Sequence, residues 1–200
     1  TSFMRDLYVA IPGYSSTRIN AAYAYGGMDL LDETLTQNFG VEIDGNVEVD
    51  FEVFQVLVDK VGGIDLELTQ AEADYICGRD QSVLYPQPLR TDWDLQEGMN
   101  HLDGEQALIH ARNRSIGNSD YRRTERQQEV LMAAFEKVKD LSAFSIAGLV
   151  KDVLPLVTTD LSFTEIIGYA MDVMSIGTGD IATYRIPEDG AYTPQTISGM

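Results

Sequence analysis

Five arginines lie within fifteen positions of an otherwise acidic chain, and they are the residues best suited to carry chemistry. They are Arg112, Arg114, Arg122, Arg123 and Arg126. A guanidinium offers a planar fork of donors that matches phosphate oxygens bidentately and never loses its charge. The cluster is therefore suited to a diphosphate or another polyanion. The alternative interpretation of such a charge run is a salt-bridged, solvated helix face.

The helix expected over residues 120–140 helps to separate these two interpretations. Its apolar stripe begins at Val130 or Leu131 and extends toward the N-terminus at three-to-four spacing. The positions that it reaches are Asp120, Arg123 and Gln127. Polar side chains that point inward at a helix N-terminus, where the dipole favours anions, indicate a phosphate pocket. Arg122 and Arg126 fall on the neighbouring face and are expected to be solvated ion pairs.

The other candidate arginines leave both interpretations open. Arg112 and Arg114 are two residues apart at a helix end, so their joint use requires the backbone to turn extended between them. Arg5 is expected within a strand beside Asp6, where an ion pair accounts for it as well as a ligand role does. Arg18 lies in an expected loop, and a solvated side chain explains it at least as well.

Composition excludes several classes of protein. The 32 acidic and 14 basic residues give a formal net charge of -18, which repels phosphates, so no nucleic acid partner is expected. Cys77 is the one cysteine, and with two histidines it cannot complete a four-ligand zinc site. The longest apolar run, residues 51–58, falls well short of the ~20 residues that a membrane span needs.

The elements that position these residues are typical of an α/β fold. A strand, a helix and a strand over 46–50, 51–61 and 64–68 form the pattern of a βαβ unit, which favours parallel pairing. Residues 14–27 and 81–100 are expected to be mostly loop, the second long enough for a lid. The other expected strands are 3–11 and 181–186, and the other expected helices are 28–38, 103–114, 120–140 and one that begins at Ser162.

Six strings of the sequence resemble, in order, the LytR-CpsA-Psr domain. They cover residues 2–6, 18–27, 49–51, 61–64, 101–108 and 120–128. The resemblance implies an α/β class fold, a three-layer α/β/α sandwich with a central mixed sheet. It also implies a phosphotransferase that moves a cell-wall glycopolymer, such as teichoic acid or a capsular polysaccharide, from a polyprenyl pyrophosphate carrier to peptidoglycan. Such proteins act outside the membrane of Gram-positive bacteria, with Mg2+.

The resemblance also assigns roles to individual residues. The pyrophosphate would be bound by Arg5, Arg18, Arg112, Arg114, Arg123 and Gln127. Asp120 and Arg123 would be catalytic, with Asp120 orienting the attacking group or a metal-bound water. The family's magnesium ligands lie in strands upstream of the segment that matches Arg5, so none is assigned here. The implied partners are the lipid-linked glycan, peptidoglycan and, through an N-terminal helix that this chain lacks, the membrane.

Several expectations remain open from the sequence. We expect a single domain over residues 1–200 that lacks the family's first strands and last strand. An elongated cavity for the lipid tail is expected between residues 51–61 and 166–174. The strand at 3–11 would expose an edge, so the chain would pair as a homodimer or be a marginally stable piece. The alternatives to a transferase are a non-catalytic module that binds polyprenyl phosphate or an anionic wall polymer, and a polyprenyl pyrophosphatase.

Overall fold

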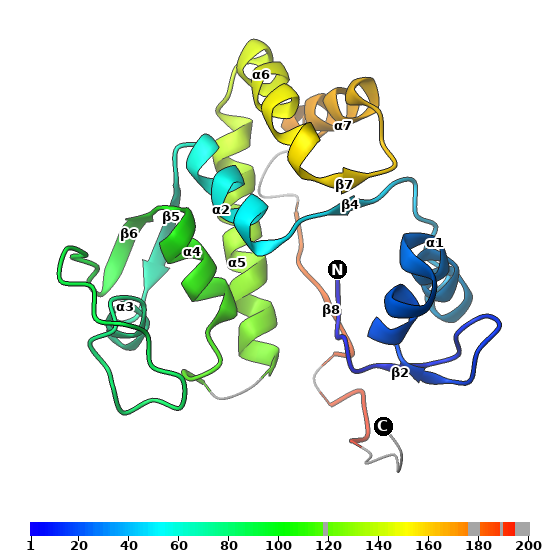
Figure 1. Ribbon diagram of the computed structural model, residues 1–200, viewed down its shortest axis with the longest axis horizontal. Coiled ribbons are helices and arrows are strands. Elements are labelled where there is room, and N and C mark those ends of the chain that lie inside the picture. The colour runs from blue at the N-terminus through cyan, green and yellow to red at the C-terminus, as the bar shows by residue number, and fades with distance from the viewer. Residues whose placement is uncertain (118–119, 176–180, 189, 195–200) are drawn as a thin grey trace. The chain divides into compact units, whose positions relative to one another are not determined.

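The computed structural model describes residues 1–117, 120–175, 181–188 and 190–194. The chain divides into two compact units, which are described separately (Figure 1). The first contains residues 1–46 and the described residues from Ala182 onward, and the second contains residues 47–175 and Ile181. The expectation of a single domain over residues 1–200 stays a prediction.

The first unit is built on one helix and two short strand pairs. Its elements are β1 Ser2–Phe3, β2 Tyr8–Val9, β3 Thr17–Arg18, α1 Asn20–Phe39 and β8 Arg185–Ile186. β1 pairs in parallel with β8, and β2 pairs antiparallel with β3. The strand expected over 3–11 is therefore two strands, because a turn at Arg5 and Asp6 interrupts it. The strand expected over 181–186 is confined to its last two residues.

Helix α1 begins earlier than the sequence indicated. Residues 20–25, expected as loop, are helical because Ile19 and Ala22 are buried against the same core as Leu35. The expected start of the helix coincides with a kink, where Gly27 adopts φ 67°, a conformation that favours glycine. The end is as predicted, since Gly40 is left-handed and its amide donates to the Thr36 carbonyl.

The second unit carries the remaining elements. Its strands are β4 Val47–Glu48, β5 Ile64–Leu68, β6 Gly98–Leu102 and β7 Thr158–Thr159. Its helices are α2 Phe51–Lys60, α3 Gln70–Ile76, α4 Gly104–Arg112, α5 Asp120–Lys139, α6 Ala143–Val153, the short 3-10 helix Leu154–Leu156 and α7 Phe163–Ser175. In the part of the chain that the structure describes, no helix is both long and apolar enough to cross a bilayer.

Strand pairing in this unit corrects one prediction. The parallel pairing of the strands on either side of α2 is wrong, because β4 pairs antiparallel with β7 and β5 pairs antiparallel with β6. The chain returns through α3 and a loop to Gly98, which places β6 beside β5 and shortens the expected loop. The α/β class is confirmed, with parallel and antiparallel pairs both present. The described strands pair two by two.

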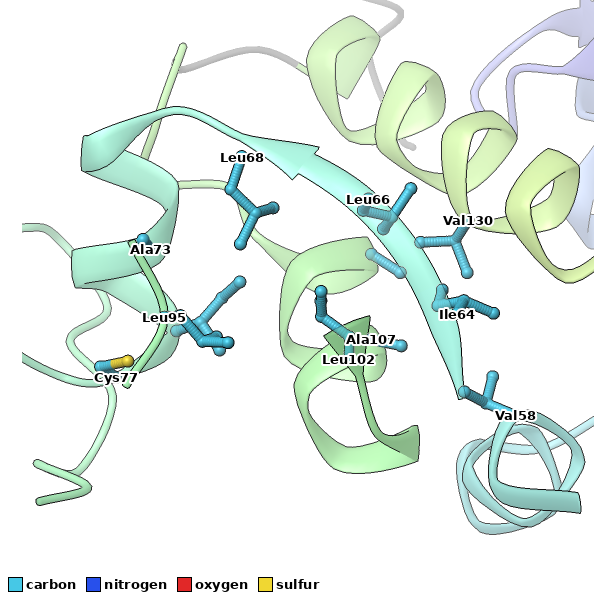
Figure 2. Packing of buried hydrophobic residues seen from close by; sticks show 12 residues of the cluster. Val58, Ile64, Leu66, Leu68, Ala73, Cys77, Leu95, Leu102, Ala107 and Val130 are labelled. Carbon is cyan, nitrogen blue, oxygen red and sulfur yellow. The ribbon is translucent and has the colours of Figure 1, made fainter. Parts of the chain in front are cut away.

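The core of the second unit lies on one face of β5. Ile64, Leu66 and Leu68 are buried, while the alternate residues are exposed, as expected for a strand with one covered face. These side chains pack with Ala107 of α4 and Val130 of α5, among others (Figure 2). The same packing fixes α4 and α5, the two helices that carry most of the candidate site, against one strand.

Capping boxes determine where α3 and α4 begin. Asp103 accepts from the Gln106 amide at 2.9 Å, and the Gln106 side chain accepts from the Asp103 amide at 3.1 Å. This confirms the predicted start of α4. The box formed by Thr69 and Glu72 starts α3, which the sequence reasoning did not predict.

The loop between α3 and β6 is held by its own arginines. Arg79 donates to the Leu95 carbonyl at 2.8 Å, and Arg90 contacts Glu105 and stacks over the Trp93 ring at 4.9 Å. Gly78 has φ 68°, and a Cβ there would lie 2.1 Å from the Pro88 carbonyl oxygen. The loop therefore approaches the end of α3 more closely than a side chain would permit.

Candidate functional site

The first turn of α5 joins the two residues predicted to be catalytic. Arg123 Nη1 lies 2.8 Å from Asp120 Oδ1, one helical turn apart. The Arg123 side chain is 11% exposed, whereas that of Asp120 is 43% exposed. The arginine is thus mostly enclosed, as the sequence predicted. The carboxylate beside the positive end of the helix dipole remains accessible to a ligand.

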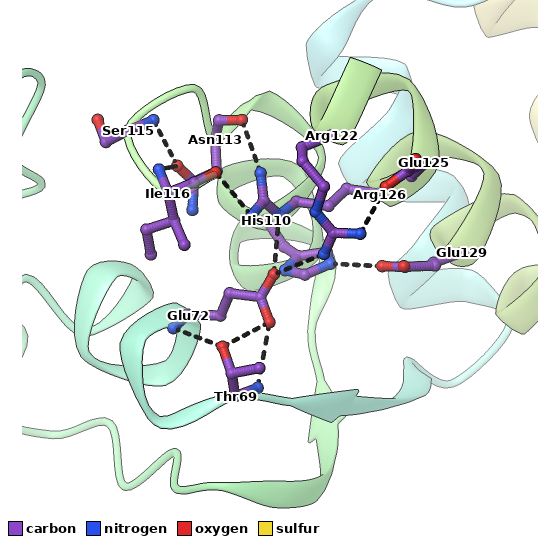
Figure 3. Close-up of polar contacts among 10 residues, drawn as sticks. All are labelled: Thr69, Glu72, His110, Asn113, Ser115, Ile116, Arg122, Glu125, Arg126 and Glu129. Carbon is purple, nitrogen blue, oxygen red and sulfur yellow. Dashed lines mark hydrogen bonds and ion pairs between the residues drawn. The ribbon is translucent and has the colours of Figure 1, made fainter. Parts of the chain in front are cut away.

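Arg126 corrects the predicted orientation of α5. The sequence placed it on a solvated face, but its side chain is 1% exposed and its Nε donates to Glu72 Oε1 at 2.9 Å (Figure 3). The buried residue one turn before Val130 is Arg126, four positions earlier, and not Gln127, three positions earlier. Leu131 is exposed, and so is Gln127, whose predicted inward position is wrong.

Arg122 is the surface ion pair that the sequence predicted. Its Nη1 lies 2.5 Å from Glu125 Oε2, and its side chain is about half exposed. The hydrogen bond to Glu125 raises the pKa of Arg122 above its ordinary value. Arg122 Nη2 also lies 3.9 Å from Glu72 Oε1. Arg122 is therefore a second, more exposed positive charge beside the buried pair of Glu72 and Arg126.

Glu72 is an ionised carboxylate inside the second unit. Burial alone would raise its pKa, but hydrogen bonds from the Thr69 amide and from Arg126 outweigh this effect and hold the pKa below its ordinary value. Its Oε2 accepts from the Thr69 amide at 3.1 Å and from the Thr69 hydroxyl at 2.8 Å. The carboxylate is therefore bound on both oxygens, as a buried charge requires.

The segment that carries Arg112 and Arg114 turns as their joint use requires. Helix α4 ends at Arg112, and Asn113 is extended at φ -60° and ψ 123°. Both arginines are exposed, while Asn113 between them is fully buried. The Arg112 guanidinium lies 4.2 Å over the ring of Phe51, the first residue of α2.

The candidates of the first unit meet at one carboxylate. Arg5 Nε lies 3.2 Å from Asp6 Oδ2, and Arg18 Nη1 lies 3.7 Å from Asp6 Oδ1. All three side chains are about half exposed. The ion pair anticipated for Arg5 is present, although in a turn rather than a strand. Asp6 thus brings two of the predicted pyrophosphate ligands together.

Sequence reasoning missed the buried polar cluster behind the arginines. Glu72, Asn113 and Arg126 are all buried, and His110 is 1% exposed with Nε2 at 3.4 Å from Glu129. His110 is thus a packed imidazole. One signal was available, since Thr69 and Glu72 have the spacing of a capping box. That spacing predicts a helix start, but it does not identify the partner of Glu72 more than fifty residues later.

The described residues do not fit a magnesium site. Within the described ranges, no group of three or more histidine, cysteine or acidic side chains is arranged to hold a metal ion. We derive no step through a metal from these residues. The expectation of Mg2+ stays a prediction.

The sequence that forms this fold and these arginine-bearing segments belongs to a recognised protein family. Residues 1–199 match the model described as the LytR_cpsA_psr family. The chain belongs to the LytR-CpsA-Psr family.

Relatives and solved structures agree with this assignment. The chain is 30% identical over 195 residues to the polyisoprenyl-teichoic acid–peptidoglycan teichoic acid transferase TagT of Bacillus subtilis, covering 96% of this chain and 58% of TagT. The crystal structure of B. subtilis TagV superposes with a TM-score of 0.71 at 29% identity, covering 91% of this chain and 67% of that one.

Some of the similar structures contain a ligand. TagT with bound octaprenyl pyrophosphate lipid has a TM-score of 0.63 at 28% identity, covering 86% of this chain and 60% of that one. The chain thus spans little more than half the length of the curated transferase that it matches.

Proposed function

We propose that the protein is a phosphotransferase that attaches a cell-wall glycopolymer from a polyprenyl pyrophosphate carrier to peptidoglycan. The observation that carries the proposal is the match of almost the whole chain to TagT, whose name describes that transfer. The similar structure of TagT with octaprenyl pyrophosphate supports the choice of carrier. The cell-wall side of the membrane is the place of action that this substrate implies.

The arginines account for binding and charge neutralisation. In the second unit, Arg112, Arg114 and Arg123 offer the forked donors that a diphosphate requires, and Gln127 adds a neutral donor at the surface of α5. Arg5 and Arg18 of the first unit carry the same kind of donor and are proposed as further pyrophosphate ligands. As the phosphoanhydride breaks, negative charge grows on the departing polyprenyl phosphate. Fixed guanidinium groups stabilise that charge without needing to reorganise.

Asp120 has the accessibility that a nucleophile-orienting group needs. Its pairing with Arg123 fixes the carboxylate, and its 43% exposure leaves oxygen lone pairs for a second hydrogen bond. A peptidoglycan hydroxyl donating to Asp120 would be aimed at the sugar-side phosphorus. The new phosphorus–oxygen bond forms as the bond to the bridging anhydride oxygen breaks, the hydroxyl proton passes to Asp120, and the polyprenyl phosphate leaves.

The lipid tail is assigned to helices α2, α6 and α7. Helix α6 packs against α7 and also contacts α2, in the region where the sequence predicted an apolar cavity (Figure 1). Exposed apolar side chains on α2 and α7 include Phe51, Val56, Phe163, Tyr169 and Met171. Each methylene buried there would contribute about 0.8 kcal/mol to binding.

The decisive experiment supplies a polyprenyl diphosphate-linked sugar and a peptidoglycan glycan acceptor, with and without Mg2+. Transfer of the phosphosugar to the glycan supports the proposal, and the two magnesium conditions test the predicted cofactor. Phosphate release without transfer would instead identify a pyrophosphatase. Binding with neither product would identify a non-catalytic module. Sedimentation of the same sample tests the predicted homodimer.

A further inference from the structure

The arginine-bearing segment after α4 is held from inside the molecule. Asn113 Oδ1 accepts from the Ser115 amide at 2.8 Å and from the Ile116 amide at 3.2 Å, which closes a tight turn around the backbone of Arg114. Asn113 is fully buried, whereas the arginines on either side of it are exposed. One buried side chain therefore fixes the backbone that carries Arg114, directly after the end of α4 at Arg112.

Arg126 holds the same turn from α5. Its Nη1 donates to the Asn113 carbonyl at 3.2 Å, and its Nη2 donates to the Ile116 carbonyl at 2.9 Å (Figure 3). The two carbonyls lie at the two ends of the Asn113 turn. The Arg126 guanidinium thus binds the backbone of residues 113–116 at two points, while its Nε donates to Glu72.

Glu72 fixes the direction of that guanidinium. Its second oxygen is bound by Thr69 at the start of α3, so the carboxylate cannot rotate without losing the capping box. Three elements, α3, the segment 113–116 and α5, therefore meet at Arg126. A lysine has one nitrogen on a flexible stem and cannot reproduce a fork that spans two carbonyls and a carboxylate.

We propose that Arg126 and Glu72 are positioning residues that set where Arg112 and Arg114 present their guanidinium groups to a diphosphate. The inference rests on the proposed function, because it assigns the framework of the same anion site. Arg126 itself is buried and does not touch the ligand. Its effect passes through the backbone of residues 113–116.

The test measures binding of geranyl pyrophosphate, a soluble prenyl diphosphate, to the full protein and its variants by calorimetry. Arg126→Lys keeps the charge and removes the fork, and it should weaken affinity about tenfold, as expected for one or two lost hydrogen bonds. Glu72→Gln, which keeps an acceptor for Arg126 and suits the capping box, should stay within roughly threefold of the unaltered protein. The matched control is Arg122→Lys, on the same turn of α5 but at the surface, which should bind normally.

A purely structural role would lower the thermal midpoint and leave the affinity of the folded protein unchanged. Asn113→Ala tests the turn from the other side without altering α5, and it should weaken affinity by a similar factor even if Arg126→Lys does not fold. Normal affinity in both Arg126→Lys and Asn113→Ala, or in the one of them that folds, combined with weak binding by Arg114→Ala, would overturn the positioning role alone. Failure of the unaltered protein to bind geranyl pyrophosphate would overturn the proposed function and the positioning role together.

Discussion

The Arg112 guanidinium stacks over the Phe51 ring, with its carbon 4.2 Å from the ring centroid. Arg112 is the last residue of α4 and Phe51 is the first of α2, so the contact joins the ends of two helices. Phe51 is 56% exposed, which leaves part of the ring open to solvent or to a ligand. The ring restricts the guanidinium while leaving its N–H edges available for an anion.

Removing the Phe51 ring should weaken diphosphate binding. A cation–π contact at an exposed site contributes about 0.5–1 kcal/mol, so Phe51→Ala should lower affinity for geranyl pyrophosphate roughly two- to fivefold. The control is Phe144→Ala on α6, where the side chain is 89% exposed. Equal losses in both variants would contradict a specific role for the Arg112 contact.

Removing the Asp6 charge should strengthen anion binding. Its carboxylate pairs with both Arg5 and Arg18, so it competes with a diphosphate for the same donors. Because exposed ion pairs are weak, Asp6→Asn should raise affinity by roughly two- to fivefold at low salt, with a smaller gain at high salt. Titration at two ionic strengths measures both effects, with Asp44→Asn as an exposed control in the same unit. Weaker binding by Asp6→Asn would show that Asp6 orients the arginines instead of competing for them.

Glu72 should make stability depend on pH in the acid range. Burial opposes ionisation of Glu72, but the hydrogen bonds from Thr69 and Arg126 hold its folded-state pKa below 4.5. The ionised group therefore stabilises the fold above that value and loses its contribution as pH falls through the folded pKa. Glu72→Gln should be less stable than the unaltered protein at pH 7 and should lose less stability on acidification.

Thermal midpoints recorded from pH 7 to about pH 3 check this expectation. Glu136→Gln, an exposed change on α5, should leave the acid limb of the curve as it is in the unaltered protein. An identical acid limb in Glu72→Gln would mean that Glu72 contributes nothing to the pH dependence.

Helix α4 should not tolerate a side chain at its first residue. A Cβ at Gly104 would lie 2.3 Å from the backbone oxygen of Gln55 in α2. Because backbone cannot yield cheaply, Gly104→Ala should destabilise the protein by about 1–3 kcal/mol. Gly148→Ala, in the exposed interior of α6 with no atom within 4 Å of the new Cβ, should stabilise it by about 0.5–1 kcal/mol. Denaturant titration compares the two, and a stable Gly104→Ala variant would show that α2 and α4 can separate.

Local signals predicted many of the elements but few of their pairings. The strand–helix–strand pattern predicted β5 at its observed bounds, and the Asp103 capping box predicted the start of α4. Pairing depends on where the chain returns, and no local pattern showed that the loop after α3 leads back antiparallel at Gly98. A two-residue strand such as β4 carries too little alternation to identify its partner.

The candidate site was predictable in its residue types and less so in its orientations. The arginine cluster was evident, and the enclosure of Arg123 agrees with prediction. The predicted orientations of Gln127 and Arg126 were the reverse of those observed. Inward positions on a helix recur every three or four residues, so extrapolating the stripe by one turn leaves an uncertainty of one residue. For a buried arginine, only knowledge of its distant partner, Glu72, would have resolved that choice.

Because Arg126 is buried against Glu72, we expect positions 72 and 126 to change together in evolution. Losing either charge strands the other in the interior, which costs about 3–5 kcal/mol, whereas replacing both by apolar residues of similar volume can be nearly neutral. A substitution at one position therefore restricts the residues that are tolerated at the other, although 54 residues separate the two in the sequence. Variant libraries that sample the two positions independently would contain many destabilised proteins, so the pair should be varied together.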